Sequence, residues 1–230
     1  MKSFLFDSVF FGAAISLGAY EAGLLIKRKF KLAILNPLLI ATICVMAVLT
    51  LLKVDYTHYN EGARYISYLL TPATVCLAVP LYQQLELLRK NLKAVAGGIT
   101  AGVLASLASV FVLAKLFSLT HEQYVTLLPK SITTAIGMGV SEELGGITTI
   151  TVAVIIITGI LGNVIAEFVC RLFRIEEPIA KGLALGTASH AIGTAKAMEL
   201  GEVEGAMSSL AIAVAGLMTA VGASLFANLM

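Results

Sequence analysis

Residues 178–205 constrain the fold more than any other stretch, because they are polar and glycine-rich yet lie between two long apolar runs. They carry His190, Lys196 and Glu199 among small and hydroxyl-bearing residues. Backbone groups and charges left bare in lipid cost several kcal/mol each. A membrane chain therefore has to hold such a segment within protein or against water. The stretch predicts the lining of a water-accessible cavity.

The rest of the chain is strongly apolar. Hydrophobic residues make up 58% of it and charged residues 13%, and the mean hydropathy is +0.93. Soluble domains carry about 25% charged residues, so the composition predicts an integral membrane protein. The apolar run at 4–26 is too long for a signal peptide and is followed by KRKFK at 27–31, so we expect it to be the first membrane helix. The candidate spans, each near the ~20 residues that a crossing needs, are 4–26, 32–52, 63–88, 92–117, 147–173 and 206–230.

Several classes of function find no support. The net charge of +2 argues against a nucleic-acid partner. Cys44, Cys76 and Cys170 lie inside apolar runs and are expected to pack as small hydrophobic residues, without disulfide or metal. The sequence contains no G-x-S-x-G, no P-loop and no H-E-x-x-H. We therefore expect no enzyme, no cofactor and no metal site.

The run at 63–88 contains Pro72 and Pro80, and each proline removes a helical hydrogen bond. One interpretation is a kinked helix. The other is a helix broken at Thr71–Thr74, with amides and hydroxyls exposed to a ligand.

The polar stretches 120–146 and 178–205 are related to one another. The string Ala-Ile-Gly begins at Ala135 and again at Ala191, and in both copies Glu-Leu-Gly begins eight residues later, at Glu143 and Glu199. A membrane helix rich in small residues follows each copy. The repeat divides the chain into an N-terminal two-helix region, 1–60, and a repeat-containing transport core, 61–230, within a single membrane domain.

Basic residues indicate how the copies are oriented. They gather at 27–31, at 89–93 and at Arg171, Arg174 and Lys181, and the positive-inside rule places all three groups in the cytoplasm. That requires 120–146 to enter the membrane and return, which makes the copies inverted. If the polar segments instead cross fully as broken helices, the copies are parallel. We expect an all-α, polytopic transmembrane bundle with inverted repeats that contain re-entrant or broken helices, the architecture of many secondary transporters.

The segment PKSITT at 129–134 has the composition of an anion-binding helix start, and Lys130 adds a full positive charge for a carboxylate. His190 could bind a carboxylate, carry a coupling proton, or simply bond to backbone. Glu143, Lys196 and Glu199 are candidate coupling charges or structural ion pairs. Glu167, inside an apolar span, could face the cavity or reach the interface. The expected substrate-binding residues are Thr71, Thr74, Lys130, Ser131, Thr133, Thr134, Ser189, His190 and Thr194.

At these residues the chain resembles the LrgB/CidB family of bacterial membrane proteins. The resemblance rests on PATVCLAVPLY at 72–82, LPKSITT at 128–134 and GLALGTASHAIGTAKAMELGEVEGA at 182–206. Ala135 stands where many members have proline, which weakens the expectation of a sharp break there.

The resemblance implies two descriptions of function. One is a holin/antiholin-like regulator of murein hydrolase activity and autolysis, acting with a small LrgA/CidA-type membrane partner. The other is a small-carboxylate transporter, since relatives include a plastid glycolate/glycerate translocator. The repeated polar stretches with Lys130 and His190 favour a carrier of small monocarboxylates such as pyruvate or glycolate, coupled to protons or ions. We expect it in the bacterial cytoplasmic membrane as a multi-pass homo-oligomer.

Overall fold

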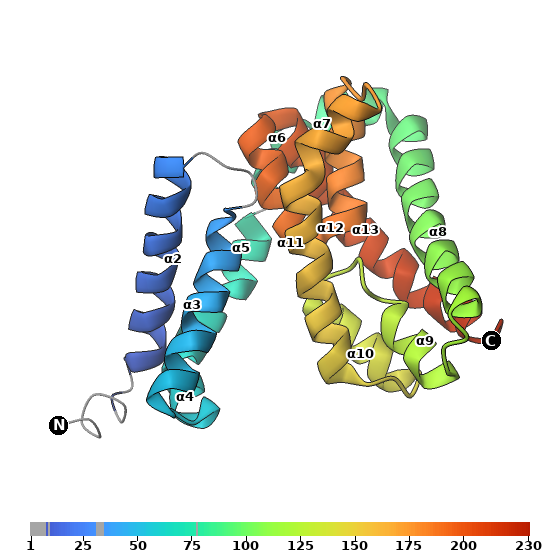
Figure 1. Ribbon diagram of the computed structural model, residues 1–230. Helices are drawn as coiled ribbons and strands as arrows, with labels where there is room; N and C mark the ends of the chain where they lie inside the picture. Colours follow the sequence, from blue (N-terminus) through green and yellow to red (C-terminus); the bar gives the residue numbers. More distant parts are fainter. Residues whose placement is uncertain (1–7, 9, 31–34, 77) are drawn as a thin grey trace. The chain divides into compact units, whose positions relative to one another are not determined.

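The computed structural model describes residues 8, 10–30, 35–76 and 78–230, apart from the side chains of Leu70, Thr71 and Thr74. The regular structure in these ranges is helical, without a strand, which confirms the all-α class. The chain divides into two compact units, Met1–Cys76 and Leu77–Met230. Figure 1 labels their helices.

The first unit contains α2 (Phe11–Phe30), α3 (Pro37–Leu52), α4 (Tyr56–Ser67) and α5 (Leu70–Cys76). Helix α2 packs against both α3 and α4. It approaches α4 closely at Gly12, where an added Cβ would collide with the backbone of Tyr59 and Ala63. The hydroxyls of Ser16 and Tyr59 lie 2.8 Å apart and join the same two helices.

The ends of α2 and α3 refine the expected spans. Helix α2 continues to Phe30, so the basic residues 27–29 form its last turn, where cations face the negative end of the helix dipole. The expected beginning of this span, at residue 4, lies outside the described residues. Asn36 caps α3 by accepting the amide of Leu38 at 2.8 Å, and Pro37 occupies the first helical position. Within the expected span 32–52, the helix therefore begins at Pro37 and ends at Leu52.

The run 63–88 is divided among the end of α4, α5, α6 (Ala78–Gln83) and α7 (Leu85–Lys90). The break expected at Thr71–Thr74 is wrong, because α5 is helical through these residues. Pro72 lies in the first turn of α5 and Pro80 in the first turn of α6, where the proline nitrogen has no helical acceptor to lose. The chain turns instead at 68–69, before α5 begins.

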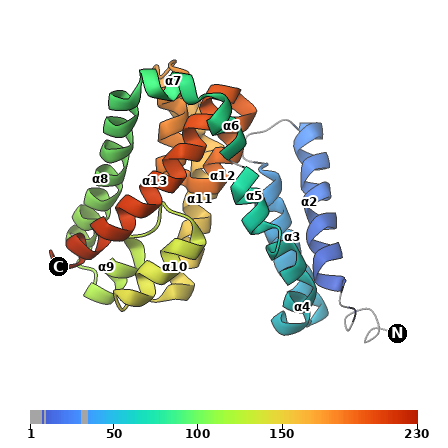
Figure 2. The same ribbon diagram turned by 180° about the vertical axis from the view of Figure 1, so that it is seen from behind.

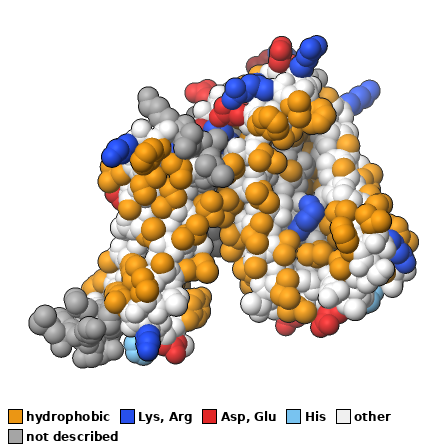
Figure 3. Space-filling model, in the orientation of Figure 1, with side chains coloured by type: hydrophobic (Ala, Val, Ile, Leu, Met, Phe, Trp, Pro, Cys, Tyr) orange, Lys and Arg blue, Asp and Glu red, His pale blue; other side chains and the backbone are white. Residues whose placement is uncertain are grey.

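The second unit contains three helices that are long and apolar enough to cross a membrane: α8 (Leu92–Leu116), α11 (Thr148–Leu172) and α13 (Glu202–Ala227). They match the expected spans 92–117, 147–173 and 206–230. Helix α13 begins earlier than expected because Glu202 and Glu204 belong to its first turn, where acidic residues face the positive end of the helix dipole. On the face seen in Figure 3, hydrophobic side chains cover much of α11, and charged side chains gather toward the helix ends.

Helices α9 (His121–Leu127) and α10 (Thr134–Glu143) form a helical hairpin. The chain leaves α9, turns through 128–133 and comes back: a Cβ on Gly137 would lie 3.5 Å from the carbonyl oxygen of Pro129. Near the end of α9, Thr126 Oγ1 accepts the amide of Ile147, which follows α10, at 2.8 Å. The first polar stretch therefore folds back on itself.

Helix α12 (Pro178–Leu200) is also a hairpin, with its tip at His190, where φ is 41° and ψ is −137°. A Cβ on Gly193 would lie 2.5 Å from the carbonyl oxygen of Leu185. Eight residues of straight helix would instead separate those positions by about 12 Å. The second half of α12 therefore runs back along the first.

The two hairpins attach to opposite ends of α11, since α10 leads into it and α12 follows it (Figure 1). Fold-back of both polar stretches agrees with the re-entrant alternative. That the copies are inverted repeats stays a prediction. Figure 2 shows α13 running from beside α6 to the end of the unit at which α9 lies. Tyr124 of α9 donates its hydroxyl to the carbonyl of Phe226 at 2.9 Å and fastens this end of α13.

Candidate functional site

A cavity of about 670 Å³ lies between α8, the first half of α12 and the turn of the first hairpin. Its walls are lined by small residues that recur at every fourth position, and their short side chains leave the space between the two helices unfilled. They are Ala94, Gly98, Gly102 and Ser106 on α8, and Ala180, Ala184 and Ala188 on α12. Asn91 and Glu177 line the end near the first turns of these helices, while Lys130 and Ser131 line the part next to Ser106.

Lys130 brings the positive charge to this cavity, which Glu177 lines at another end. Its Nζ donates to Ser131 Oγ at 2.9 Å and to Ser106 Oγ at 3.4 Å, and Ser106 Oγ donates to Ser131 Oγ at 3.0 Å. The lysine is half-buried and Ser131 is buried. The turn between α9 and α10 places both side chains here, because it carries 129–131 past the middle of α8.

Lys130 forms no ion pair with any residue that the structure describes. A half-buried ammonium is favourable only when another group compensates its charge. Two serine hydroxyls supply acceptors but no negative charge. An ammonium with two hydroxyls beside an open space can therefore receive a small anion, because all three groups can donate to a carboxylate.

His190 lies at the tip of the second hairpin and packs against α11, away from this cavity. It is 4% exposed, and its Nε2 lies 3.0 Å from the carbonyl oxygen of Ile155. Gly159 leaves room for the ring, since a Cβ there would come within 2.8 Å of it. Of the roles considered for His190, the structure shows the bond to backbone. The neighbouring Ser189 is buried against Gly162 of α11.

The remaining expected threonines are spread over the unit. Thr194 is buried, where its hydroxyl lies 2.7 Å from that of Ser208 and donates to the carbonyl of His190 at 3.1 Å. Thr133 precedes α10 as its N-cap without a side-chain capping bond, and Thr134 begins that helix; neither lines the cavity. The side chains of Thr71 and Thr74 lie outside the part that the structure describes.

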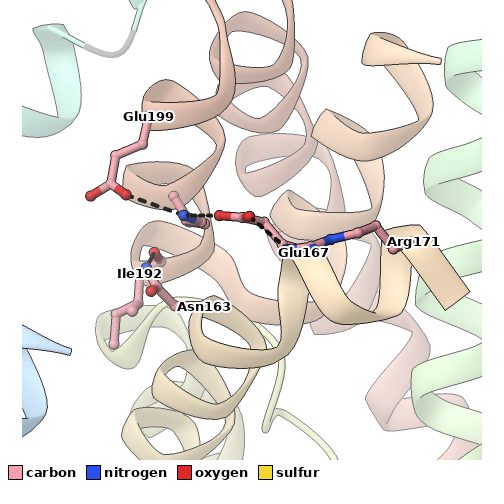
Figure 4. A network of polar contacts seen from close by, with 6 residues as sticks. Asn163, Glu167, Arg171, Ile192 and Glu199 are labelled. Atoms are coloured by element: carbon pink, nitrogen blue, oxygen red, sulfur yellow. Dashed lines mark hydrogen bonds and ion pairs between the residues drawn. The ribbon is translucent and has the colours of Figure 1, made fainter. Parts of the chain in front are cut away.

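Lys196 lies at the centre of a separate charge network that joins the second half of α12 to α11 (Figure 4). Its Nζ lies 2.6 Å from Glu167 Oε1 and 3.3 Å from Glu199 Oε2, and Arg171 Nη2 lies 3.3 Å from Glu167 Oε2. The Lys196 side chain is only 15% exposed. The network holds the returning half of the hairpin against α11. Glu143 is exposed and forms no ion pair with a described residue.

Ser106 on α8 and Thr187 on α12 add two hydroxyl-bearing side chains to the lining of the cavity. Ser106 was not among the expected site residues, because a serine in an apolar span usually bonds to its own helix. The repetition of small residues at 94, 98, 102 and 106 was the available signal. Thr187 is buried, and a Cβ on Gly102 would lie 2.6 Å from its Oγ1, so α8 and α12 meet closely at this point.

Known proteins resemble this chain over nearly its whole length. The model of the LrgB-like family matches residues 16–229. The chain belongs to the LrgB-like family. Antiholin-like protein LrgB of Bacillus cereus (strain B4264) is 38% identical over 218 residues, covering 94% of this chain and 95% of the relative. Antiholin-like protein LrgB of Bacillus anthracis (strain CDC 684 / NRRL 3495) is similar to the same extent. No solved structure matches the chain. With three helices among its described residues that are long and apolar enough to cross a membrane, this LrgB-like chain is a membrane protein.

Proposed function

We propose that this LrgB-like protein acts as its relatives are named, as an antiholin-like membrane protein, and that its molecular activity is the movement of small monocarboxylates across the membrane. The names of the relatives favour the first half of this proposal directly. The cavity around Lys130 supports the second half. The two are compatible if a change in carboxylate flux is what influences lysis.

The observation that supports carriage is the half-buried Lys130 in a cavity of about 670 Å³, with Ser106 and Ser131 as its only hydrogen-bond partners in the described chain. One positive charge matches one carboxylate. The small residues around it leave space for a short chain such as that of pyruvate or glycolate. Larger dianions would place a second charge against Ala and Gly, where nothing compensates it.

The helical hairpins fit a carrier better than a lysis pore. A pore needs helices that associate through long uniform faces, whereas two polar segments that fold back beside α11 can change access to a site between them. We therefore propose proton- or ion-coupled transport by a multi-pass protein of the bacterial cytoplasmic membrane. We further propose that the protein forms a homo-oligomer. In its antiholin-like role it would act with a small LrgA/CidA-type membrane partner to control murein hydrolases and autolysis.

Transport is tested with purified protein in liposomes. We expect saturable uptake of labelled pyruvate or glycolate, and faster uptake with a proton gradient. Absence of saturable uptake with and without the gradient would remove the carrier half of the proposal.

The antiholin-like half is tested in cells. We expect expression of the chain in a host lacking its own relatives to slow autolysis. A Lys130→Gln variant separates the halves: if it no longer transports but still slows autolysis, the antiholin-like role does not depend on carboxylate flux. If wild-type expression leaves autolysis unchanged, that role is not supported.

A further inference from the structure

A second hollow, which shares no residue with the Lys130 cavity, lies where α11 ends and α12 begins. Its volume is about 320 Å³. It is lined by three basic residues, two acidic residues and an apolar wall: Arg171, Arg174 and Lys181; Glu167 and Glu176; Cys170, Ile175 and Leu200. We propose that this hollow binds the phosphate group of an anionic phospholipid, with Arg174 and Lys181 as its principal ligands.

The charges of the hollow leave these two cations available. Glu167 is compensated by Lys196 at 2.6 Å and by Arg171 at 3.3 Å. Arg174 and Lys181 form no ion pair with any residue in the described ranges. Glu176 and Arg174 are both exposed, so water screens their charges alike. The lining holds three basic and two acidic side chains, so an anion that enters the hollow meets a net positive charge.

A rigid turn holds Arg174 in place. Helix α11 ends in a Schellman motif, in which the amide of Arg174 donates to the carbonyl of Arg171 at 3.2 Å and the amide of Ile175 donates to that of Cys170 at 2.8 Å. Arg174 itself has φ 54°. These bonds engage carbonyls of the last helical turn that would otherwise repel an anion. The guanidinium is therefore attached to a fixed backbone position next to Lys181.

The depth of the hollow fits a lipid headgroup. Helix α11 has 25 residues, or about 37 Å of helix, and the hydrocarbon core of a bilayer is about 30 Å thick. Its last turn therefore reaches the headgroup region.

The surface beside the hollow is apolar. Phe168, Leu172 and Phe173 are 66%, 61% and 70% exposed, and the first two line an adjoining hollow with Arg171. Acyl chains can cover these side chains while the phosphate meets the cations. A free phosphate ion would leave them uncovered, so the site favours a lipid over a soluble phosphate ester.

The test is native mass spectrometry of the full chain in detergent, with equal amounts of phosphatidylglycerol and phosphatidylcholine. We expect the wild type to retain phosphatidylglycerol preferentially. Arg174→Gln/Lys181→Gln should lower that preference by about fivefold for each basic side chain removed. The matched control is Arg89→Gln/Lys93→Gln, which removes the same charge from outside the hollow. These residues belong to α7 and the start of α8, at the same end of the unit as the turn between α11 and α12 (Figure 1).

Three results would overturn the proposal. One is a wild type without preference for phosphatidylglycerol, a measurement that does not depend on how the variants fold. Another is an equal loss in the control variant, which would indicate general charge attraction. The third is binding of glycerol 1-phosphate as strong as that of the lipid, which would identify a soluble phosphate ester as the ligand. Retention of the preference by the control and its loss in Arg174→Gln/Lys181→Gln support the site.

Discussion

The fold-back of α12 makes an unusual prediction for Gly193. In the interior of a continuous helix, replacing glycine by alanine stabilises a protein by about 0.5–1 kcal/mol. In the hairpin, a Cβ on Gly193 would lie 2.5 Å from the carbonyl oxygen of Leu185 and 2.6 Å from the Cβ of Ser189. The first of these is backbone and cannot rotate away. Overpacking of this kind costs about 1–3 kcal/mol, so Gly193→Ala should lower the free energy of unfolding by roughly that amount.

The measurement is the free energy of unfolding in detergent micelles, followed by circular dichroism against denaturant. Gly97 and Gly139 serve as matched controls, since both are helical and a Cβ on either meets nothing within 4 Å. Gly97→Ala and Gly139→Ala should be neutral or stabilising. If Gly193→Ala is as stabilising as the controls, the two halves of α12 do not lie against each other and the hairpin is refuted.

Three further predictions concern the surroundings of this hairpin. A double-mutant cycle of Glu167→Gln and Lys196→Met should give a coupling energy of about 1–2 kcal/mol, between the values of exposed and buried ion pairs. If the effects of the two substitutions on the free energy of unfolding simply add, the ion pair is contradicted. His190→Gly should destabilise less than His190→Ala, because glycine adopts the positive φ at the tip freely while both lose the ring's hydrogen bond; the reverse order would argue against the observed turn. In a background with the native cysteines replaced, Glu176→Cys should resist a membrane-impermeant thiol reagent added to intact cells, and labelling from outside would reverse the expected orientation.

Much of the second unit could be predicted from the sequence, because the length and polarity of each segment determine whether it can cross a membrane as a helix. The apolar runs that became α8, α11 and α13 each match the thickness of a bilayer, so their existence and approximate ends follow from composition. The polar copies at 120–146 and 178–205 allowed two alternatives, re-entrant hairpins or broken helices that cross fully, and the placement of basic residues favoured the first, with which the fold-back of both segments agrees. The division of 63–88 was harder to predict, because Pro72 and Pro80 both lie in the first turn of a new helix and a proline alone does not say on which side of it a helix stops.

The site was predicted in part. Lys130 and Ser131, singled out by the anion-binding composition of 129–134, lie together in a cavity. His190 lies against α11 because Gly159 leaves space for its ring, and that depends on the register between two helices 31 positions apart in sequence. Side-chain neighbours across such distances are not encoded in local spacing. Ser106 was missed for the same reason.

The central claim, that Lys130 binds the carboxylate that is carried, is tested most directly by uptake into liposomes containing Lys130 variants. Loss of a charge-assisted hydrogen bond is worth about 1.5–3 kcal/mol, so Lys130→Gln should weaken the apparent affinity for pyruvate or glycolate by roughly 10- to 150-fold. Lys115→Gln, which removes an exposed lysine outside the cavity, should transport like the wild type. Saturable uptake by Lys130→Gln with the affinity and rate of the wild type would contradict the account.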